Sequence, residues 1–259
     1  RNQYCGVEEL KYEGMSFYFI DNEYYFKRQG IYGFYDEAER YAFFCRAALE
    51  SVKYLDFKPD ILHCHDWQSG MISPLLKAHY SEDPCYKDIK TLFTIHDLQY
   101  QGIFPKEILG ELLDLTEEYF SIDGVEFYGG VSFVKGGLNY SDVITTVSNT
   151  YADEIQTPFF GERLDDLLRK RKEDLYGIVN GIDYTLFNPA KDKNIFAAYD
   201  VKNIGKKAEN KLKLQQQLGL QVNKDIPLIA MVFRLTRRKG IDLIAHTIDE
   251  LLSGDIQMV

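Results

Sequence analysis

The sequence lacks the features that are typical of small zinc-binding, disulfide-rich or membrane proteins. It holds only four cysteines in 259 residues, and no two form a Cys-x-x-Cys pair, which excludes a zinc ribbon and a thioredoxin-type redox motif. No apolar run reaches the roughly 18 residues of a membrane helix, and the N-terminus has no signal pattern. We therefore expect reduced thiols, a cytoplasmic location and no membrane partner.

Positive charge is also scarce. Lys and Arg number 30 against 40 Asp and Glu, a net charge of −10, which disfavours a nucleic-acid partner. The chain is rich instead in apolar residues, at 45% hydrophobic and 14% aromatic, enough to bury one large core or two smaller ones. This composition excludes disorder for most of the chain.

Strand and helix patterns alternate along the first two thirds of the chain. Asp36 and Glu39 are spaced as a helix cap and third helical residue, and an apolar stripe follows them. The predicted strands are 15–20, 61–65, 89–96, 143–148 and 176–179, and the predicted helices are 38–52, 131–139 and 151–156. Such alternation favours a mostly parallel sheet covered by helices on both faces, with ligands at the carboxyl ends of the strands.

The pattern changes after residue 180. Gly, Asp, Asn and Pro fill 180–189, and a Lys-rich stretch then leads to an amphipathic segment ending at Gly219. A buried strand (226–233), a helix (240–252) and another strand start follow. We predict an α/β domain over 1–180, a hinge and helix over 181–222, and the start of a second α/β domain over 223–259. The chain is expected to be a piece of a longer one.

Polar residues cluster directly after three predicted strands. In His63-Cys64-His65-Asp66-Trp67, alternation places both histidines on one face, where they could be two metal ligands of a hydrolase or make structural hydrogen bonds. The remaining histidines, His79, His96 and His246, complete no such site.

The other two strand ends allow a site or a structural interpretation. The segment 94–102 carries His96, Asp97 and Gln101 before Gly102, where a sharp turn would leave backbone groups free to face a ligand. The segment 179–183 places Asn180 before a glycine at the proposed domain boundary, a pattern that also fits a plain turn.

A fourth cluster is cationic. Arg234-Leu235-Thr236-Arg237-Arg238-Lys239-Gly240 lies between a predicted strand and a predicted helix. Four cations in six residues favour an anion, and a helix N-terminus adds free N–H groups, so phosphate fits best. A solvated turn is the alternative. The spacing is not that of a Walker loop.

Taken in order, these segments resemble the bacterial glycogen synthase and plant starch synthase family. The resemblance rests on H-C-H-D-W at 63–67, T-I-H-D-L-Q-Y-Q-G at 94–102, V-N-G-I-D at 179–183 and R-L-T-R-R-K-G at 234–240, and it extends to 37–50, 123–137 and 207–211. It implies a GT-B fold of two Rossmann-like domains, the first nearly complete here. It also implies retaining transfer of glucose from ADP-glucose to the non-reducing 4-OH of an α-1,4-glucan, with no cofactor and no metal.

The resemblance also implies roles for individual residues. Arg234 and Lys239 would bind the donor diphosphate and stabilise the charge that it gains as it leaves. His96 would lie against the glucosyl unit through its backbone carbonyl and ring, with Asp66 in the same pocket. The list of candidates is completed by substrate-binding Tyr32, Gln101 and Asn180.

Two departures from the family pattern stand out. Asp97 occupies a position where the family commonly has Asn. The family's N-terminal Lys-Thr-Gly-Gly-Leu and C-terminal Glu-x-x-Gly-Leu motifs are absent from these 259 residues, so we expect this piece alone to be inactive. Two other interpretations stay open: a metal-dependent hydrolase built on His63 and His65, and a glucan- or nucleotide-binding module without catalysis.

Overall fold

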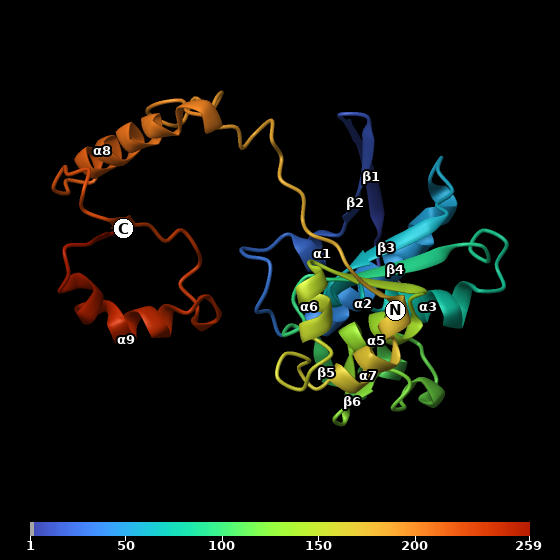
Figure 1. The fold of residues 1–259 in the computed structure, drawn as a ribbon. Coiled ribbons are helices and arrows are strands. Elements are labelled where there is room, and N and C mark those ends of the chain that lie inside the picture. The colour runs from blue at the N-terminus through green and yellow to red at the C-terminus, as the bar shows by residue number, and fades with distance from the viewer. Residues whose placement is uncertain (1–2) are drawn as a thin grey trace. The chain divides into compact units, whose positions relative to one another are not determined.

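A computed structural model describes residues 3–259, except the side chain of Arg238. The chain forms two compact units, Arg1–Asn180 and Gly181–Val259 (Figure 1). Each unit is described by itself below. The three-part division with a boundary at 222/223 stays a prediction.

The first unit is built on a four-stranded parallel sheet. Its strands run in the order β3-β4-β8-β9. They span Ile61–His65 (β3), Lys90–Ile95 (β4), Val143–Thr146 (β8) and Leu175–Gly177 (β9). Each lies within one or two residues of its predicted range, and β3 matches it at both ends. The carboxyl ends of all four strands therefore meet at one edge, as the alternating pattern predicted.

Helices connect the strands and cover the sheet. They are α1 (Glu23–Phe26), α2 (Glu37–Ser51), α3 (Ile72–Leu75), α4 (Ile108–Glu111), α5 (Phe133–Tyr140), α6 (Asn149–Glu154) and α7 (Asp165–Lys170). Helix α5 is capped by Ser132, whose Oγ accepts from the Lys135 N–H at 3.2 Å. Ser148 caps α6 in the same way, through the Tyr151 N–H at 2.9 Å. These caps satisfy donors that a helix start leaves unpaired.

Two smaller antiparallel sheets complete the first unit. One is the hairpin of β1 (Gly6–Tyr12) and β2 (Met15–Asp21), which extends away from the rest of the unit (Figure 1). The other joins β5 (Ile103–Pro105), β7 (Gly130–Ser132) and β6 (Glu126–Phe127) in that order. The strand predicted over 15–20 is confirmed as β2.

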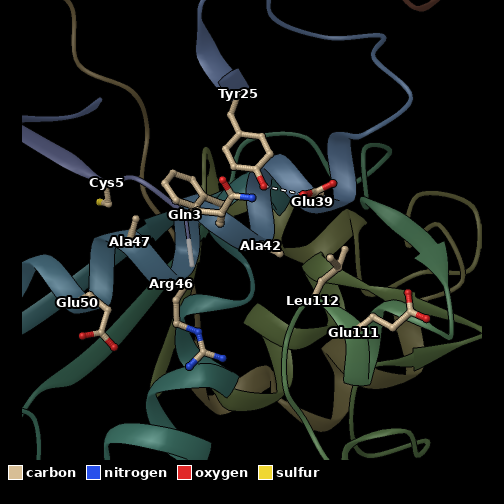
Figure 2. A pocket seen from close by; sticks show the side chains of 11 residues that line it. Gln3, Cys5, Tyr25, Glu39, Ala42, Arg46, Ala47, Glu50, Glu111 and Leu112 are labelled. Carbon is tan, nitrogen blue, oxygen red and sulfur yellow. Dashed lines mark hydrogen bonds between the residues drawn. The ribbon is translucent and has the colours of Figure 1, made fainter. Parts of the chain in front are cut away.

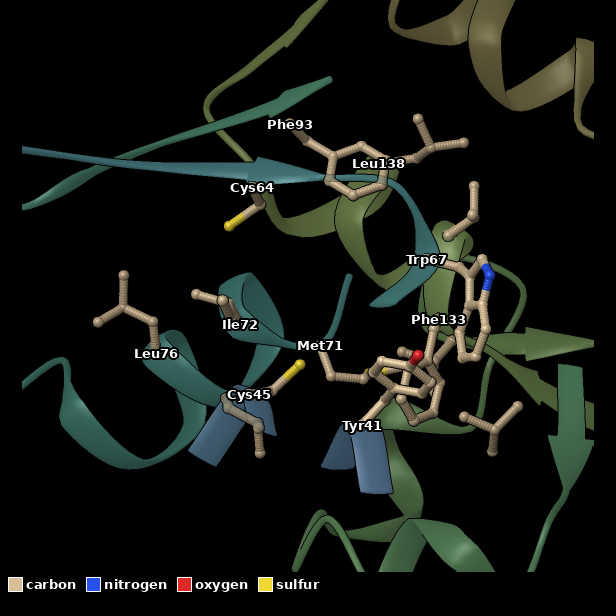
Figure 3. Packing of buried hydrophobic residues seen from close by; sticks show 14 of the residues in the cluster. Tyr41, Cys45, Cys64, Trp67, Met71, Ile72, Leu76, Phe93, Phe133 and Leu138 are labelled. Carbon is tan, nitrogen blue, oxygen red and sulfur yellow. The ribbon is translucent and has the colours of Figure 1, made fainter. Parts of the chain in front are cut away.

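The core lies between the parallel sheet and its helices (Figure 3). Cys64 of β3 and Phe93 of β4 point into it, and both are buried. Helix α5 approaches the sheet closely because Gly137 has no side chain: a Cβ there would come within 2.5 Å of the Phe93 ring. Close packing of this kind fixes the strand ends that carry the polar clusters.

Two local predictions are wrong in detail, although both helices are present. The helix predicted over 131–139 begins at Phe133, because residues 130–132 pair as strand β7. Helix α2 begins at Glu37, but Asp36 makes no side-chain capping bond. Its carboxylate binds both terminal nitrogens of Arg28, at 2.6 and 2.7 Å, and Glu39 accepts from the Tyr25 hydroxyl. A bidentate charged pair outcompetes a single cap bond.

The second unit contains α8 (Lys207–Gln217), β10 (Leu228–Ile229), α9 (Ile241–Leu252) and β11 (Gln257–Met258). The predicted helix 240–252 and amphipathic segment are confirmed. The predicted buried strand 226–233 is wrong in extent: only two residues pair, in parallel with β11, and Val232 is exposed. Among the described residues of 181–259, Gln215 and Ile226 are the buried ones. A strand with one short partner has no second neighbour to bury it.

Candidate active site at the carboxyl edge of the parallel sheet

Strand β3 sorts its side chains by alternation. Cys64 packs into the core (Figure 3), while His63 and His65 lie together on the opposite face, with ring centroids 4.1 Å apart. His63 Nε2 bonds Thr94 Oγ1 at 2.6 Å, and Thr94 Oγ1 lies 2.6 Å from Thr145 Oγ1. Burial, followed by the nearby His96, lowers the pKa of His63. This hydrogen-bonded row crosses β3, β4 and β8.

Asp66 stands where β3 ends and adopts a positive φ of 55°. Its own N–H donates to the Thr94 carbonyl at 3.0 Å, and its Oδ1 accepts from the His96 N–H at 2.8 Å. Burial raises the pKa of this carboxyl, opposed by the His96 N–H that it accepts. A non-glycine residue held at positive φ stores backbone strain, and such strain is concentrated at functional sites.

His65 and His96 meet across the β3–β4 pair. His65 Nδ1 lies 3.0 Å from His96 Nε2, a hydrogen-bond distance. The structure thus joins two histidines that the sequence placed in separate clusters. Asp66 and His96, both predicted catalytic residues, are likewise in direct contact.

Trp67 links the two strand-end loops. Its indole packs against Gly102, where an added Cβ would lie 2.4 Å from the ring, and Gly102 has a φ of +57°. Only glycine fits that combination of conformation and contact. The turn in this segment lies at residues 98 and 99 rather than at Gly102. The contact of Gly102 with Trp67 packs the 96–102 loop onto the loop after β3.

Gln101 is buried in this same loop. Its Nε2 donates to the Glu162 carbonyl at 2.9 Å, while its Oε1 is the buried side-chain polar atom without a partner among residues 3–259. The side chain lines a cavity of about 550 Å³ together with Trp67, Tyr100 and Arg163. A buried hydrogen-bond acceptor without a donor costs free energy of folding, which is consistent with a residue that binds a polar ligand.

Tyr32 and Asn180 lie at the same end of the unit. The Tyr32 hydroxyl accepts from Gln68 Nε2 at 3.1 Å, which ties it to the loop after β3. Asn180 is exposed and follows β9, where the Ile178 N–H still donates to the Thr146 carbonyl at 2.8 Å. Neither residue contacts His96 through a hydrogen bond among the described residues. Asp97 uses its Oδ1 to accept the Gln99 N–H at 3.2 Å.

The cationic turn belongs to the second unit. Residues 237–239 form a 3-10 turn that Gly240 ends in the left-handed conformation, and α9 follows. Arg237 pairs with Asp242 at 3.2 Å. Arg234 and Lys239 are exposed, and within the described part of the chain neither forms an ion pair. Their charges are therefore available to an anion.

A second cavity, of about 660 Å³, contains none of the predicted site residues. It lies along helix α2 and is lined by Cys5, Glu39, Arg46, Glu50 and Glu111, among others (Figure 2). The Tyr25 hydroxyl donates to Glu39 at 2.7 Å on its wall. This cavity shares no lining residue with the cavity of about 550 Å³ beside Gln101.

Sequence reasoning missed several residues that build the site. The Ser69 hydroxyl accepts a hydrogen bond from the His65 N–H at 2.6 Å and donates one to the His65 carbonyl at 2.8 Å. Gln68 holds Tyr32, and Glu162 holds Gln101. The spacing of four between His65 and Ser69 was a weak signal for the first bond. Nothing local marks the other two, because they join segments far apart in sequence.

No group of three or more His, Cys, Asp or Glu side chains within residues 3–259 is placed to hold a metal ion. The same residues form no helix long and apolar enough to cross a membrane.

Comparison with solved structures defines the class of fold. The catalytic domain of starch synthase IV from Arabidopsis thaliana, bound to ADP and acarbose, matches 98% of this chain and 53% of its own, with a TM-score of 0.89 and 34% identity. The α/β fold of GT-B type predicted from the sequence is confirmed.

The family follows from the sequence comparisons. A family model for the starch synthase catalytic domain matches residues 1–170. Glycogen synthases of Desulforamulus reducens and Anoxybacillus flavithermus are 56% and 53% identical over all 259 residues, which make up 54% of each relative. The chain belongs to the glycogen and starch synthase family, as its motifs predicted, and it spans about half the length of these relatives.

Proposed function

We propose that the protein containing this chain is a glycogen or starch synthase. It transfers glucose from ADP-glucose to the non-reducing 4-OH of an α-1,4-glucan and retains the anomeric configuration. The observation that carries the proposal is the contact of Asp66 with His96 at the carboxyl edge of β3 and β4, in a chain more than half identical to glycogen synthases. The related starch synthase IV domain was solved with ADP and acarbose, which supports a nucleotide donor and a glucan-like acceptor.

The proposed roles follow from where charge develops. As the bond from glucose to the diphosphate breaks, the sugar ring becomes oxocarbenium-like and the phosphate gains negative charge. The backbone carbonyl of His96 offers a partial negative charge to the sugar. Arg234 and Lys239 offer full positive charges to the leaving diphosphate. Each group thus interacts more strongly with the transition state than with the bound donor.

The remaining residues bind and orient substrate in this scheme. Asp66 holds the His96 backbone through the 2.8 Å bond to its N–H, which fixes the peptide group between Ile95 and His96 at the end of the strand. The buried Oε1 of Gln101 would accept a sugar hydroxyl. Tyr32 and Asn180, at the same end of the unit, would complete the substrate contacts. All four cysteines are free thiols, which supports a site of action in the reducing cytoplasm.

The test is incorporation of labelled glucose into glycogen by the full-length protein. ADP-glucose and UDP-glucose are compared as donors, each with and without a metal chelator. We expect chelator-resistant transfer with ADP-glucose preferred. Transfer abolished by the chelator would favour a metal-dependent reaction instead.

A variant separates catalysis from binding in the same assay. His96→Ala should depress transfer while leaving ADP affinity almost unchanged, because its proposed contact is with the sugar. If the folded wild-type protein binds ADP or glucan but transfers nothing, a binding module without catalysis becomes the better description. Loss of ADP affinity with normal turnover in His96→Ala would contradict the role given to His96.

A further inference from the structure

The ring of His96 has a single hydrogen-bond partner among residues 3–259. The backbone N–H of His96 is tied to Asp66, but the imidazole itself bonds only His65, from Nε2 to Nδ1 at 3.0 Å. The two rings lie 5.2 Å apart between centroids at an interplanar angle of 35°. His96 is exposed, so without this bond its ring would be free to rotate about the Cα–Cβ bond.

His65 is far better anchored than His96. Its backbone N–H and carbonyl both bond the Ser69 hydroxyl, at 2.6 and 2.8 Å. Its ring lies against the tilted ring of His63, with centroids 4.1 Å apart, and Thr94 holds His63 at 2.6 Å. Thr94 in turn contacts Thr145 on the next strand. A chain of contacts therefore runs from three sheet strands to the His65 ring.

The bond also constrains the protons on both rings. A hydrogen bond between two imidazoles forms only when one of the two facing nitrogens carries a proton and the other a lone pair, so it is lost when both rings are protonated. Burial, helped by His63 and His96 and opposed by Asp66, lowers the pKa of His65. His65 therefore stays neutral at pH values where a free histidine begins to protonate, and the bond persists.

We propose that His65 is a positioning residue for His96: it occupies Nε2 of that ring and leaves Nδ1 as the ring nitrogen that faces the sugar. The inference rests on the proposed function, in which His96 lies against the glucosyl unit. It assigns a role that needs no metal to His65, the second histidine of the His-x-His pattern. His65 sets the orientation of the His96 ring, couples the tautomer of His96 to its own, and touches no substrate.

The test compares three substitutions in the full-length protein. His65→Leu removes the bond. His65→Asn places an amide near the position of Nδ1 and can restore it. His246→Leu is the matched control, because His246 is exposed on α9 in the other unit. Long-range proton–nitrogen spectra of 15N-histidine protein read the tautomer of His96 directly, and steady-state kinetics give kcat and KM for the donor.

We expect His65→Leu to merge the two His96 nitrogen signals toward a tautomer average and to lower kcat about tenfold, a loss of about 1.4 kcal/mol. KM for the donor should change by less than about twofold, since the bond orients a group rather than binding substrate. His65→Asn should recover most of kcat and restore distinct nitrogen signals. His246→Leu should change neither.

Unchanged His96 signals in His65→Leu would overturn the inference, whatever happens to the rate. Should the leucine variant fail to fold, His65→Asn against His65→Gln decides, because only the asparagine amide reaches the Nδ1 position. Absence of glucosyl transfer by the wild-type protein would instead defeat the proposed function. The spectra would still report whether His65 holds His96, so the two failures can be told apart.

Discussion

In the first unit the polar residues at the carboxyl edge of the sheet are joined by hydrogen bonds, whereas in the second unit the cations of the 234–239 turn stand exposed. Asp66, His96, His65 and Ser69 are joined by hydrogen bonds of 2.6 to 3.0 Å. Arg234 and Lys239 are exposed. The first unit thus carries a hydrogen-bonded arrangement of polar residues, while the second carries exposed positive charge.

Two ion pairs repeat this contrast. In the first unit, Arg28 binds Asp36 at 2.6 Å with side chains 16% and 4% exposed, and Arg28 holds the pKa of Asp36 below its usual value. In the second, Arg237 lies 3.2 Å from Asp242 with side chains 90% and 45% exposed. Water competes with the second pair and hardly reaches the first. The side chains of the first pair are therefore costly to reorient, and those of the second are easily moved.

Matched leucine substitutions should give the largest difference between the units. Leu138 is fully buried in α5, while Leu243 on α9 is 70% exposed. Leu138→Ala should lower the free energy of unfolding by about 2 to 5 kcal/mol through transfer and cavity terms. Leu243→Ala should stay within about 0.5 kcal/mol of wild type.

Urea unfolding followed by two probes checks the leucine pair. The fluorescence of Trp67, the one tryptophan of the chain, reports on the first unit, and far-ultraviolet circular dichroism reports on both. Equal losses in the two variants would mean that the second unit has a core as tight as the first, and would break the comparison.

Removal of one cation should lower the rate without unfolding the protein. Arg234→Ala and Lys239→Ala in the full-length protein should each reduce turnover by roughly one to three powers of ten, since we propose that each charge stabilises the leaving diphosphate. Arg237→Ala is the matched control: it removes a cation from the same turn, but one that already pairs with Asp242. Equal losses of turnover in all three variants would mean that the turn acts only through its total positive charge. Near-normal turnover in Arg234→Ala and Lys239→Ala would contradict the assignment of a phosphate site to these residues.

Acid should produce the smallest of the three effects, through two histidines of the first unit. Burial lowers the pKa values of His63 and His65 below the ordinary 6.5. The unfolded chain therefore binds more protons than the folded one once the pH falls below about 6.5, and the free energy of unfolding decreases there. Asp66, whose pKa is raised, acts in the opposite direction at lower pH.

Urea midpoints between about pH 7.5 and 5.5 isolate this histidine effect, because carboxyl groups of ordinary pKa stay ionised in that interval. The wild-type midpoint by Trp67 fluorescence should fall with pH. The double variant His63→Asn, His65→Asn should show a flatter dependence. An identical slope in both proteins would place the acid sensitivity elsewhere.

Sequence patterns predicted the parallel sheet well because each strand and helix carries its own period. β3 matches its predicted range, and the ends of β4, β8 and β9 shift by one or two residues. The short strand β7 was missed, since Val131 and Ser132 read equally well as a helix start. The prediction of an extended strand over 226–233 was wrong. An apolar run shows that a segment tends to be buried, but not whether neighbouring strands are present to cover it.

The sequence by itself determined which residues follow each strand, and hence that Asp66, His96 and Asn180 share one edge of a parallel sheet. Tertiary structure decided what those residues touch. In the folded chain His65 bonds His96, Tyr32 bonds Gln68, and Asp36 bonds Arg28 instead of capping its helix. These partners lie between 8 and 36 residues apart. Strand order and loop packing bring them together, and neither is written in a local pattern.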